Sequence, residues 1–339
     1  MSANGYLIDR ATRHQVFIQR FASGQVKESL PILRQMLRDI RAALAQQDLT
    51  SFQTARLIVL QSDITAITAA AGVAMSELYT PSMIEFATYE AEFTQRLLQG
   101  AVTVQLAGVS TVALSGALTS APMSLVSGKR VVNTTFAGIF EVFSSGAARE
   151  VMTAVQAGIT AGSTNAEITQ QVMGLVNTRT RAQAEAVIIT AANKAGSTAR
   201  AELYKANADV LKGEEWTSVL DLSTTNVCMG RDGKIYPVGE GPQPPAHYRC
   251  RSIRVPVVDQ RFAALRYGST RASMQGPVSS KTTYNSWLKS QPNEIQDEVL
   301  GVERAKLFRG GMNVDKFTDD AGRTLSIDEL RAMEGLTLQ

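Results

Sequence analysis

The sequence contains few of the residues that build reactive or metal-binding centres. Among its 339 residues there are only two cysteines and two histidines. Two cysteines exclude a disulfide-rich secreted scaffold and any zinc site made of four cysteines. A mechanism that needs an imidazole must use His14 or His247, because the chain has no other histidine. We expect His14 to lie on a polar helix face without a functional role.

Charged residues are also scarce. They make up 19% of the chain, whereas hydrophobic residues make up 44%. This balance favours extensive helix packing or a large partner surface. The net charge of +3, averaged over the molecule, is too small to indicate a nucleic-acid-binding protein. Any basic binding surface must therefore be local.

No charged residue occurs between Leu97 and Gly128, which raises the question of a membrane segment. The stretch is rich in Ala, Gly, Ser and Thr, and it includes Gln99, Gln105 and Pro122. Its mean hydropathy falls short of that of a typical spanning helix. We expect closely packed helices or a subunit contact here, and conditional membrane contact is the alternative.

Apolar residues in the first 99 positions recur at three- and four-residue spacing, which predicts amphipathic helices. The stripes are Leu30, Leu33, Leu37, Ile40 and Leu44, and then Leu57, Leu60, Ile64 and Ile67. Pro81 should end one helix and open the next, because proline cannot continue a helix interior. We therefore expect the core of a helical bundle in this region.

Glycines and capping residues divide the middle of the chain. Gly158 and Gly162 predict a helix end, and Ser163 or Thr164 can cap a following helix over 165–176. A long helix is expected over 178–210, with an interruption near Gly196 and an end at Lys212-Gly213.

The pattern then changes from helix to strands and turns. Strands are predicted over 216–220 and 253–258, with Asp232-Gly233 as a tight turn between them. A polar, basic arm should follow over 263–291. Short helices are expected around Trp287, Val299 and Leu307, and a last one should be capped by Ser326. The predicted fold is mainly α, with a helical N-terminal bundle over 1–145, a small α+β Cys/His hairpin module within 146–260, and a basic arm with short helices over 261–339.

Cys228, His247 and Cys250 lie in one short segment and could supply three soft ligands to zinc. A structural zinc site needs four ligands, and Asp232 could be the fourth, although an Asp-Gly turn more often bonds its own backbone. The competing interpretation is a Cys228–Cys250 disulfide, or packed thiols with His247 hydrogen-bonded nearby. No carboxylate is placed as a general base. We expect a structural knuckle, no catalytic residue and no cofactor, with zinc as the alternative.

The segment from about Ala147 to Val257 resembles the Mu F-like head morphogenesis proteins, which are minor head proteins of tailed bacteriophages. The resemblance is carried by Leu220-Asp221, Thr224-Thr225, Cys228, Asp232-Gly233-Lys234, Pro244-Pro245, His247, Cys250-Arg251 and Val255-Pro256-Val257. Many family members have a Cys-x-x-Cys pair before the Asp-Gly turn, and here Thr225 stands where the first cysteine would fall. The family's Arg-Thr-Glu in the preceding helix appears as Ile189-Thr190-Ala191.

The resemblance implies a structural protein of low copy number inside the capsid. It would associate with portal and capsid proteins, assist head assembly and accompany DNA during ejection, with several copies per particle. A membrane is not an expected partner. The start of the chain lacks the basic residues and apolar run of a signal peptide, so we expect synthesis in the host cytoplasm. Alternatives are an ejected virion protein that acts on membranes or binds DNA, and a toxin-like enzyme.

Arginines cluster after the knuckle and could contact packaged DNA. Arginine forms bidentate contacts with phosphate, so such binding would be independent of base sequence. A solvated face, or a contact with an acidic portal surface, is the competing interpretation. The candidate DNA contacts are Arg249, Arg251, Arg254, Arg261, Arg266 and Arg271.

Overall fold

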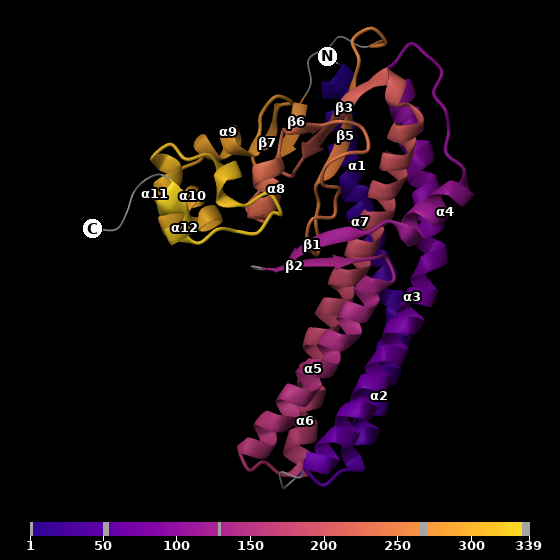
Figure 1. Ribbon diagram of the computed structural model, residues 1–339, viewed down its shortest axis with the longest axis vertical. Helices are drawn as coiled ribbons and strands as arrows, with labels where there is room; N and C mark the ends of the chain where they lie inside the picture. Colours follow the sequence, from indigo (N-terminus) through magenta and orange to yellow (C-terminus); the bar gives the residue numbers. More distant parts are fainter. Residues whose placement is uncertain (1–2, 50–53, 128–129, 265–269, 334–339) are drawn as a thin grey trace. The chain divides into compact units, whose positions relative to one another are not determined.

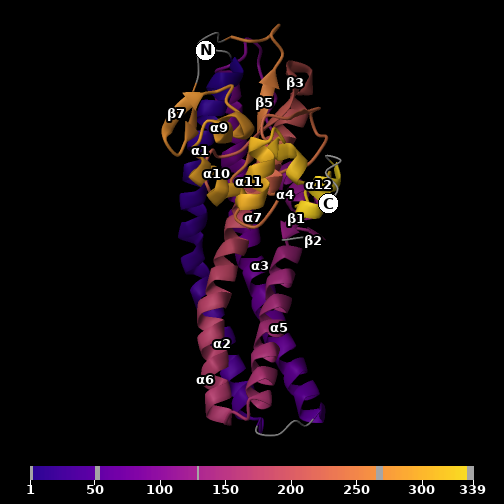
Figure 2. The same ribbon diagram turned by 90° about the vertical axis from the view of Figure 1, so that its left-hand side faces the viewer.

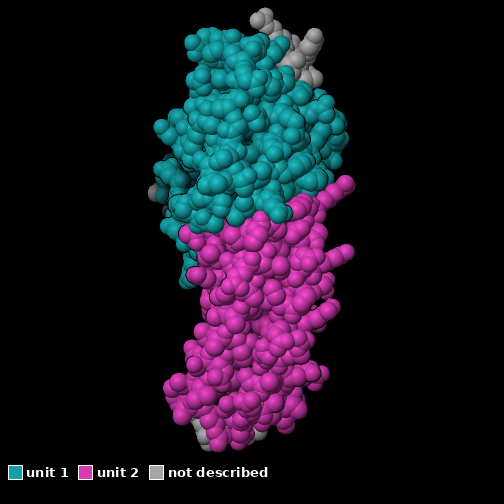
Figure 3. Space-filling model, turned by 90° about the vertical axis from the view of Figure 1, so that its right-hand side faces the viewer, with its two compact units in different colours: residues 1–18, 84–134, 193–339 teal, residues 19–83, 135–192 magenta. Residues whose placement is uncertain are grey.

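The chain forms two compact units, each assembled from segments that are far apart in the sequence (Figure 3). The computed structural model describes residues 3–49, 54–127, 130–264 and 270–333. Unit 1 comprises residues 1–18, 84–134 and 193–339, and unit 2 comprises residues 19–83 and 135–192. The predicted boundaries near residues 145 and 260 divide the chain into consecutive domains, and this division stays a prediction.

Long helices dominate the chain and confirm the predicted class, which is mainly α with small sheets (Figures 1 and 2). Helices α1, α3 and α7 contribute residues to both units. The helical segments up to residue 206 are α1 (Ala3–Gln25), η1 (Val26–Ser29), α2 (Leu30–Ala45), α3 (Thr54–Gln99), α4 (Thr111–Ser120), α5 (Gly138–Thr160), α6 (Asn165–Leu175), the π-helical η2 (Val176–Thr180) and α7 (Arg181–Ala206).

The helices of unit 2 follow the predicted apolar stripes. Leu33, Ile40 and Leu44 of α2 are buried, and so are Leu60 and Ile64 of α3. At the start of α6, the Thr164 hydroxyl accepts the Glu167 backbone N–H while the Glu167 carboxylate accepts the Thr164 N–H. This reciprocal cap confirms the predicted helix start.

Two predicted helix breaks are wrong. Helix α3 continues through Pro81, because Tyr79 and Met83 on either side are fully buried and their packing outweighs the one backbone bond that proline removes. Helix α7 continues through Gly196. A Cβ at this position would lie 3.5 Å from Glu90 Oε2, so the small residue adjoins a buried ion pair and does not break the helix.

The predicted end of the long helix at Lys212-Gly213 is also wrong, because α7 ends at Ala206 and both residues lie in strand β3 (Leu211–Thr217). A Cβ on Gly213 would lie 2.5 Å from the Tyr236 carbonyl oxygen. The glycine therefore permits the close approach of β3 to the neighbouring strand β4 (Ile235–Tyr236).

Unit 1 is built around a three-stranded antiparallel sheet of order β4-β3-β5. Strand β5 (Ile253–Val258) matches its prediction, and Trp216 of β3 is opposite Arg254 of β5. The six-residue helix α8 (Asn226–Arg231) lies between β3 and β4 in the chain. Two hairpins complete the strands: β1 (Met123–Ser127) with β2 (Arg130–Thr134), and β6 (Thr270–Ser273) with β7 (Gly276–Ser279).

The C-terminal part of unit 1 has its own apolar core, which includes Trp287, Phe308 and Phe317. The predicted short helices are present, and Ser326 caps the last one by accepting the Glu329 N–H. The predicted polar arm is instead an ordered hairpin followed by a helix. These helical segments are α9 (Tyr284–Lys289), α10 (Asn293–Leu300), α11 (Val302–Arg309), η4 (Val314–Phe317) and α12 (Ile327–Met333).

The described part of the uncharged stretch is helical only in part. It holds the end of α3, α4 and β1, and Leu106, Leu114 and Leu118 are buried within unit 1. The prediction of closely packed helices therefore holds for part of this segment. Among the described residues, one helix, α3, is long and apolar enough to cross a membrane, and core helices of soluble proteins meet the same criterion.

Candidate functional site

The knuckle, defined here as Cys228, His247 and Cys250, is formed by a helix and the loop that precedes β5. Cys228 lies in α8, where its backbone N–H donates to the Thr225 carbonyl. His247 and Cys250 close a tight turn in which the Cys250 N–H donates to the His247 carbonyl. Arg249 within this turn has a φ of +57°, which reverses the chain sharply enough to bring the two side chains together. The predicted grouping is confirmed.

Three donor atoms converge in the knuckle. Cys228 Sγ lies 3.7 Å from Cys250 Sγ and 3.3 Å from His247 Nε2, and all three donor atoms lie within 4.8 Å of one another. Both cysteines are buried free thiols. The disulfide alternative therefore does not describe this structure, whereas packed thiols beside a bonded histidine do.

Contacts within the knuckle fix where its protons lie. The His247 Nδ1–H donates to the Tyr248 carbonyl over 2.8 Å, which turns Nε2 toward the thiols. Burial and the Cys250 neighbour raise the pKa of Cys228 well above its usual range. Burial opposes ionisation of Cys250 too, but the bond from Cys228 and the charge and bond of His247 hold its pKa well below that range. The knuckle therefore favours a thiolate at Cys250.

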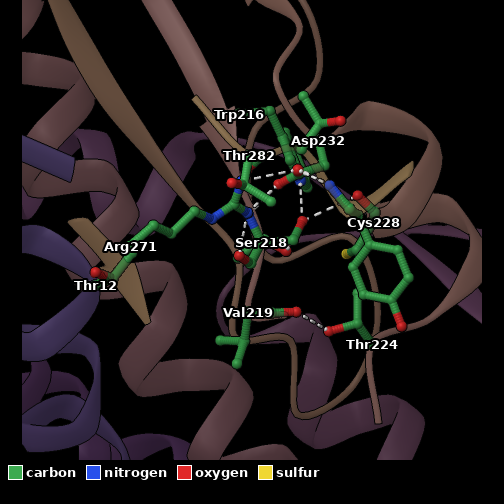
Figure 4. A network of polar contacts seen from close by, with 12 residues as sticks. Thr12, Trp216, Ser218, Val219, Thr224, Cys228, Asp232, Arg271 and Thr282 are labelled. Carbon is green, nitrogen blue, oxygen red and sulfur yellow. Dashed lines mark hydrogen bonds and ion pairs between the residues drawn. The ribbon is translucent and has the colours of Figure 1, made fainter. Parts of the chain in front are cut away.

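Asp232 is not the fourth ligand, because its carboxylate holds a separate buried network (Figure 4). It accepts the Ser218 N–H over 2.7 Å and the Tyr284 N–H over 2.6 Å, and it forms an ion pair with Arg271. Arg271 Nη1 also donates to the Thr282 carbonyl over 2.7 Å. This network connects the residue that follows β3, strand β6 and the start of α9, so Asp232 has a structural role.

The buried hydroxyl oxygen of Thr225 has no hydrogen-bond partner among the described residues. A cavity of about 330 Å³ is lined by both Thr225 and His247. Two thiolates on one tetrahedral zinc ion would lie about 3.8 Å apart, given Zn–S bonds of about 2.3 Å. The observed sulfur separation of 3.7 Å fits this value, so the three donors suit zinc with one position left for a further ligand.

Burial removes two arginines from the candidate DNA contacts. The Arg254 side chain is 2% exposed and forms an ion pair with Glu214, with Nε 3.3 Å from Oε2. The Arg271 side chain is also 2% exposed in its pair with Asp232. The sequence pattern shows a run of positive charge but not the buried carboxylates, which lie about forty positions away in the chain.

The other candidate arginines differ in exposure. Arg251 forms a two-pronged pair with Asp221 and is partly exposed. Arg261 is 74% exposed beside Asp259, and Arg249 occupies the knuckle turn. Arg266 lies outside the described residues. A DNA contact through any of these four stays a prediction.

A buried ionic cluster in unit 1 was not foreseen from the sequence. Glu90 is fully buried between His14, whose Nε2 is 2.5 Å from Oε1, and Arg200, whose Nη1 is 3.1 Å from Oε2. The His14 ring also stacks on Phe93, with centroids 3.6 Å apart. The expectation that His14 lies on a polar helix face is therefore wrong. The other members of this cluster lie on α3 and α7, far from His14 in the sequence. The residue spacing within one helix cannot predict such contacts.

Comparison with known proteins gives one match. No curated protein and no solved structure matches the chain. Residues 149–254 match the family described as Phage Mu protein F like protein, and this range contains the whole knuckle together with α7, β3 and α8. The resemblance to the Mu F-like head morphogenesis family is thus confirmed over residues 149–254.

Proposed function

We propose that the chain is a structural minor head protein of a tailed bacteriophage, present in low copy inside the capsid near the portal. The observation that carries this proposal is the family match over 149–254, which points to head morphogenesis. In this role the protein assists head assembly through contacts with portal and capsid proteins and accompanies the genome during ejection.

The construction of the knuckle supports a structural role over a toxin-like enzyme. Both ring nitrogens of His247 are engaged within the fold, Nδ1 with the Tyr248 carbonyl and Nε2 with Cys228. Both thiols are buried. A nucleophile or base must reach its substrate, whereas these groups hold α8 against the loop before β5.

The location and copy number of the chain in particles test the proposal. Quantitative mass spectrometry of purified particles should find far fewer copies than of the major capsid protein. Particles emptied of DNA should contain less of the chain if it leaves with the genome. Its absence from intact particles, or a copy number equal to that of the capsid protein, would overturn the proposal.

Zinc is the cofactor that the knuckle would hold, through Cys228, His247 and Cys250. The sulfur separation of 3.7 Å and the thiolate favoured at Cys250 support this assignment. Bound zinc would cross-link α8 to the loop before β5 and stabilise the fold there. Arg249, Arg251 and Arg261 remain candidate contacts with the packaged DNA in the proposed genome-associated role.

A further inference from the structure

Unit 2 contains a groove between α2 and the segment formed by α6 and η2. Helix α2 packs against α6, as both ribbon views show (Figures 1 and 2). One hollow of about 200 Å³ is lined by Arg34, Asn177 and Arg181, among others. A second, wider hollow of about 710 Å³ is lined by Arg41, Asn165 and Asn177. Asn177 lines both hollows, so they lie next to each other, and together they are called here the α2–α6 groove.

The groove has a rim of positive charge. Arg34, Arg38 and Arg41 are exposed and follow α2 at positions i, i+4 and i+7, so they share one face of the helix. Arg179 and Arg181 are exposed at the end of η2 and the start of α7. None of the five forms an ion pair with a carboxylate in the part of the chain that the structure describes. Five guanidiniums without a carboxylate partner among the described residues form a strong local field in a protein of low net charge.

The lining of the groove carries no opposing charge. No aspartate or glutamate is among the residues that line either hollow. Neutral hydrogen-bonding side chains lie between the arginines, from Asn165, Thr169, Gln170, Asn177 and Thr180. The Asn165 amide already bonds Gln47 and Leu49, whereas the other side chains of this set can donate to anionic oxygens. The site therefore suits an extended anion better than a single small one.

The arginines, rather than the apolar lining, favour nucleic acid as the occupant. Apolar side chains also line the hollows, among them Leu30, Leu37 and Met173, so an acidic amphipathic helix is the competing occupant that the test must distinguish. Arginine pairs with phosphate in a bidentate geometry. No aromatic residue lines the groove, so bases have no stacking platform there.

We propose that the α2–α6 groove binds the phosphate backbone of nucleic acid, independently of base sequence, through Arg34, Arg41 and Arg181. The proposal rests on the proposed function only for the presence of DNA near the protein, and the binding itself does not depend on it. Binding is measured in solution with the purified full chain, so failure of one proposal does not imply failure of the other. Arg38 and Arg179 line neither hollow and are exposed on the elements that form the groove.

Fluorescence anisotropy with labelled single-stranded and duplex oligonucleotides of mixed sequence tests the groove. The variant R34Q/R41Q/R181Q is compared with R13Q/R96Q/R149Q, which removes three charges from exposed arginines outside the groove. The groove variant should bind about tenfold more weakly or worse, and its slope of log affinity against log salt should fall by about three. The control variant and R34K/R41K/R181K should retain most of the binding.

Three outcomes would overturn the proposal. The first is an absence of oligonucleotide binding by the unmodified chain at low salt. The second is an equal loss of affinity in the groove and control variants, which would indicate general attraction. The third is stronger binding of polyglutamate than of an oligonucleotide of matched charge, which would assign the groove to an acidic protein segment. Thermal melting of each variant verifies that the fold is intact.

Discussion

At the scale of single residues, Thr225 determines how many protein ligands the knuckle can offer. Its hydroxyl is buried and unpartnered among the described residues, and it lines the same cavity as His247. Replacing Thr225 by Cys should add a fourth ligand and raise zinc affinity by at least about tenfold. Competition with a chromogenic chelator measures the change. Thr224→Cys is the matched control, and equal zinc affinities in both variants would show that position 225 does not reach the metal position of the knuckle.

Arg271 and Arg261 were both expected to contact DNA, but the Arg271 side chain is buried and the Arg261 side chain is exposed. Arg271→Ala leaves the Asp232 charge buried and unpaired, so unfolding free energy should fall by about 3 to 5 kcal/mol. Arg261→Ala removes only an exposed, solvent-screened pair and should leave the unfolding free energy nearly unchanged. Urea denaturation distinguishes the two, and similar losses in both variants would show that the Asp232 network does not form.

Glu215 makes stability depend on pH. Burial raises its pKa from 4.5 to about 7. The unfolded chain therefore releases a proton that the folded protein retains, and the contribution of Glu215 to stability falls as pH rises from about 4.5 to about 7. Glu215→Gln should stabilise the fold at pH 8 by on the order of 2 kcal/mol and have little effect at pH 4.

Thermal melting across this pH range measures the difference between Glu215→Gln and the parent chain. Glu85→Gln is the control, because Glu85 is exposed on α3. A stabilisation by Glu215→Gln that is the same at both ends of the range would contradict a raised pKa at this position.

At the scale of elements, local patterns predicted most helices and one of the two main strands. The stripe on α2, the capping residues of α6 and the apolar run of β5 each depend on neighbours in sequence. Pro81 and Gly213 misled because their surroundings come from elsewhere in the fold: buried packing carries α3 through the proline, and β4 approaches the glycine. Local propensity is a weak guide where tertiary contacts oppose it.

Gly213 should be intolerant of a side chain. Gly213→Ala places a Cβ 2.5 Å from the Tyr236 carbonyl oxygen, so strand β4 must move and stability should fall by about 2 kcal/mol or more. Gly146→Ala within α5 meets no atom within 4 Å and should gain up to about 1 kcal/mol from the helix propensity of alanine. Chemical denaturation gives both values, and a neutral Gly213→Ala would mean that β3 and β4 are less close than described.

At the scale of the whole molecule, the candidate site could be predicted only where its residues lie close together in the sequence. The knuckle residues lie within 23 positions of one another, and they were grouped in advance. The burial of Arg254 and Arg271 and the ionic cluster around Glu90 depend on partners that the chain order separates. The same separation makes each compact unit a combination of distant segments. The positive surface expected after the knuckle is partly buried, and the α2–α6 groove offers another.

The central claim is that the chain works in the phage head beside the portal. Cross-linking of intact particles followed by mass spectrometry tests it most directly, because cross-linked lysine pairs identify the neighbours of the chain. The account predicts cross-links between this chain and the portal protein, in particles that contain few copies of it. Cross-links confined to tail proteins, or spread uniformly over the major capsid protein, would contradict the account.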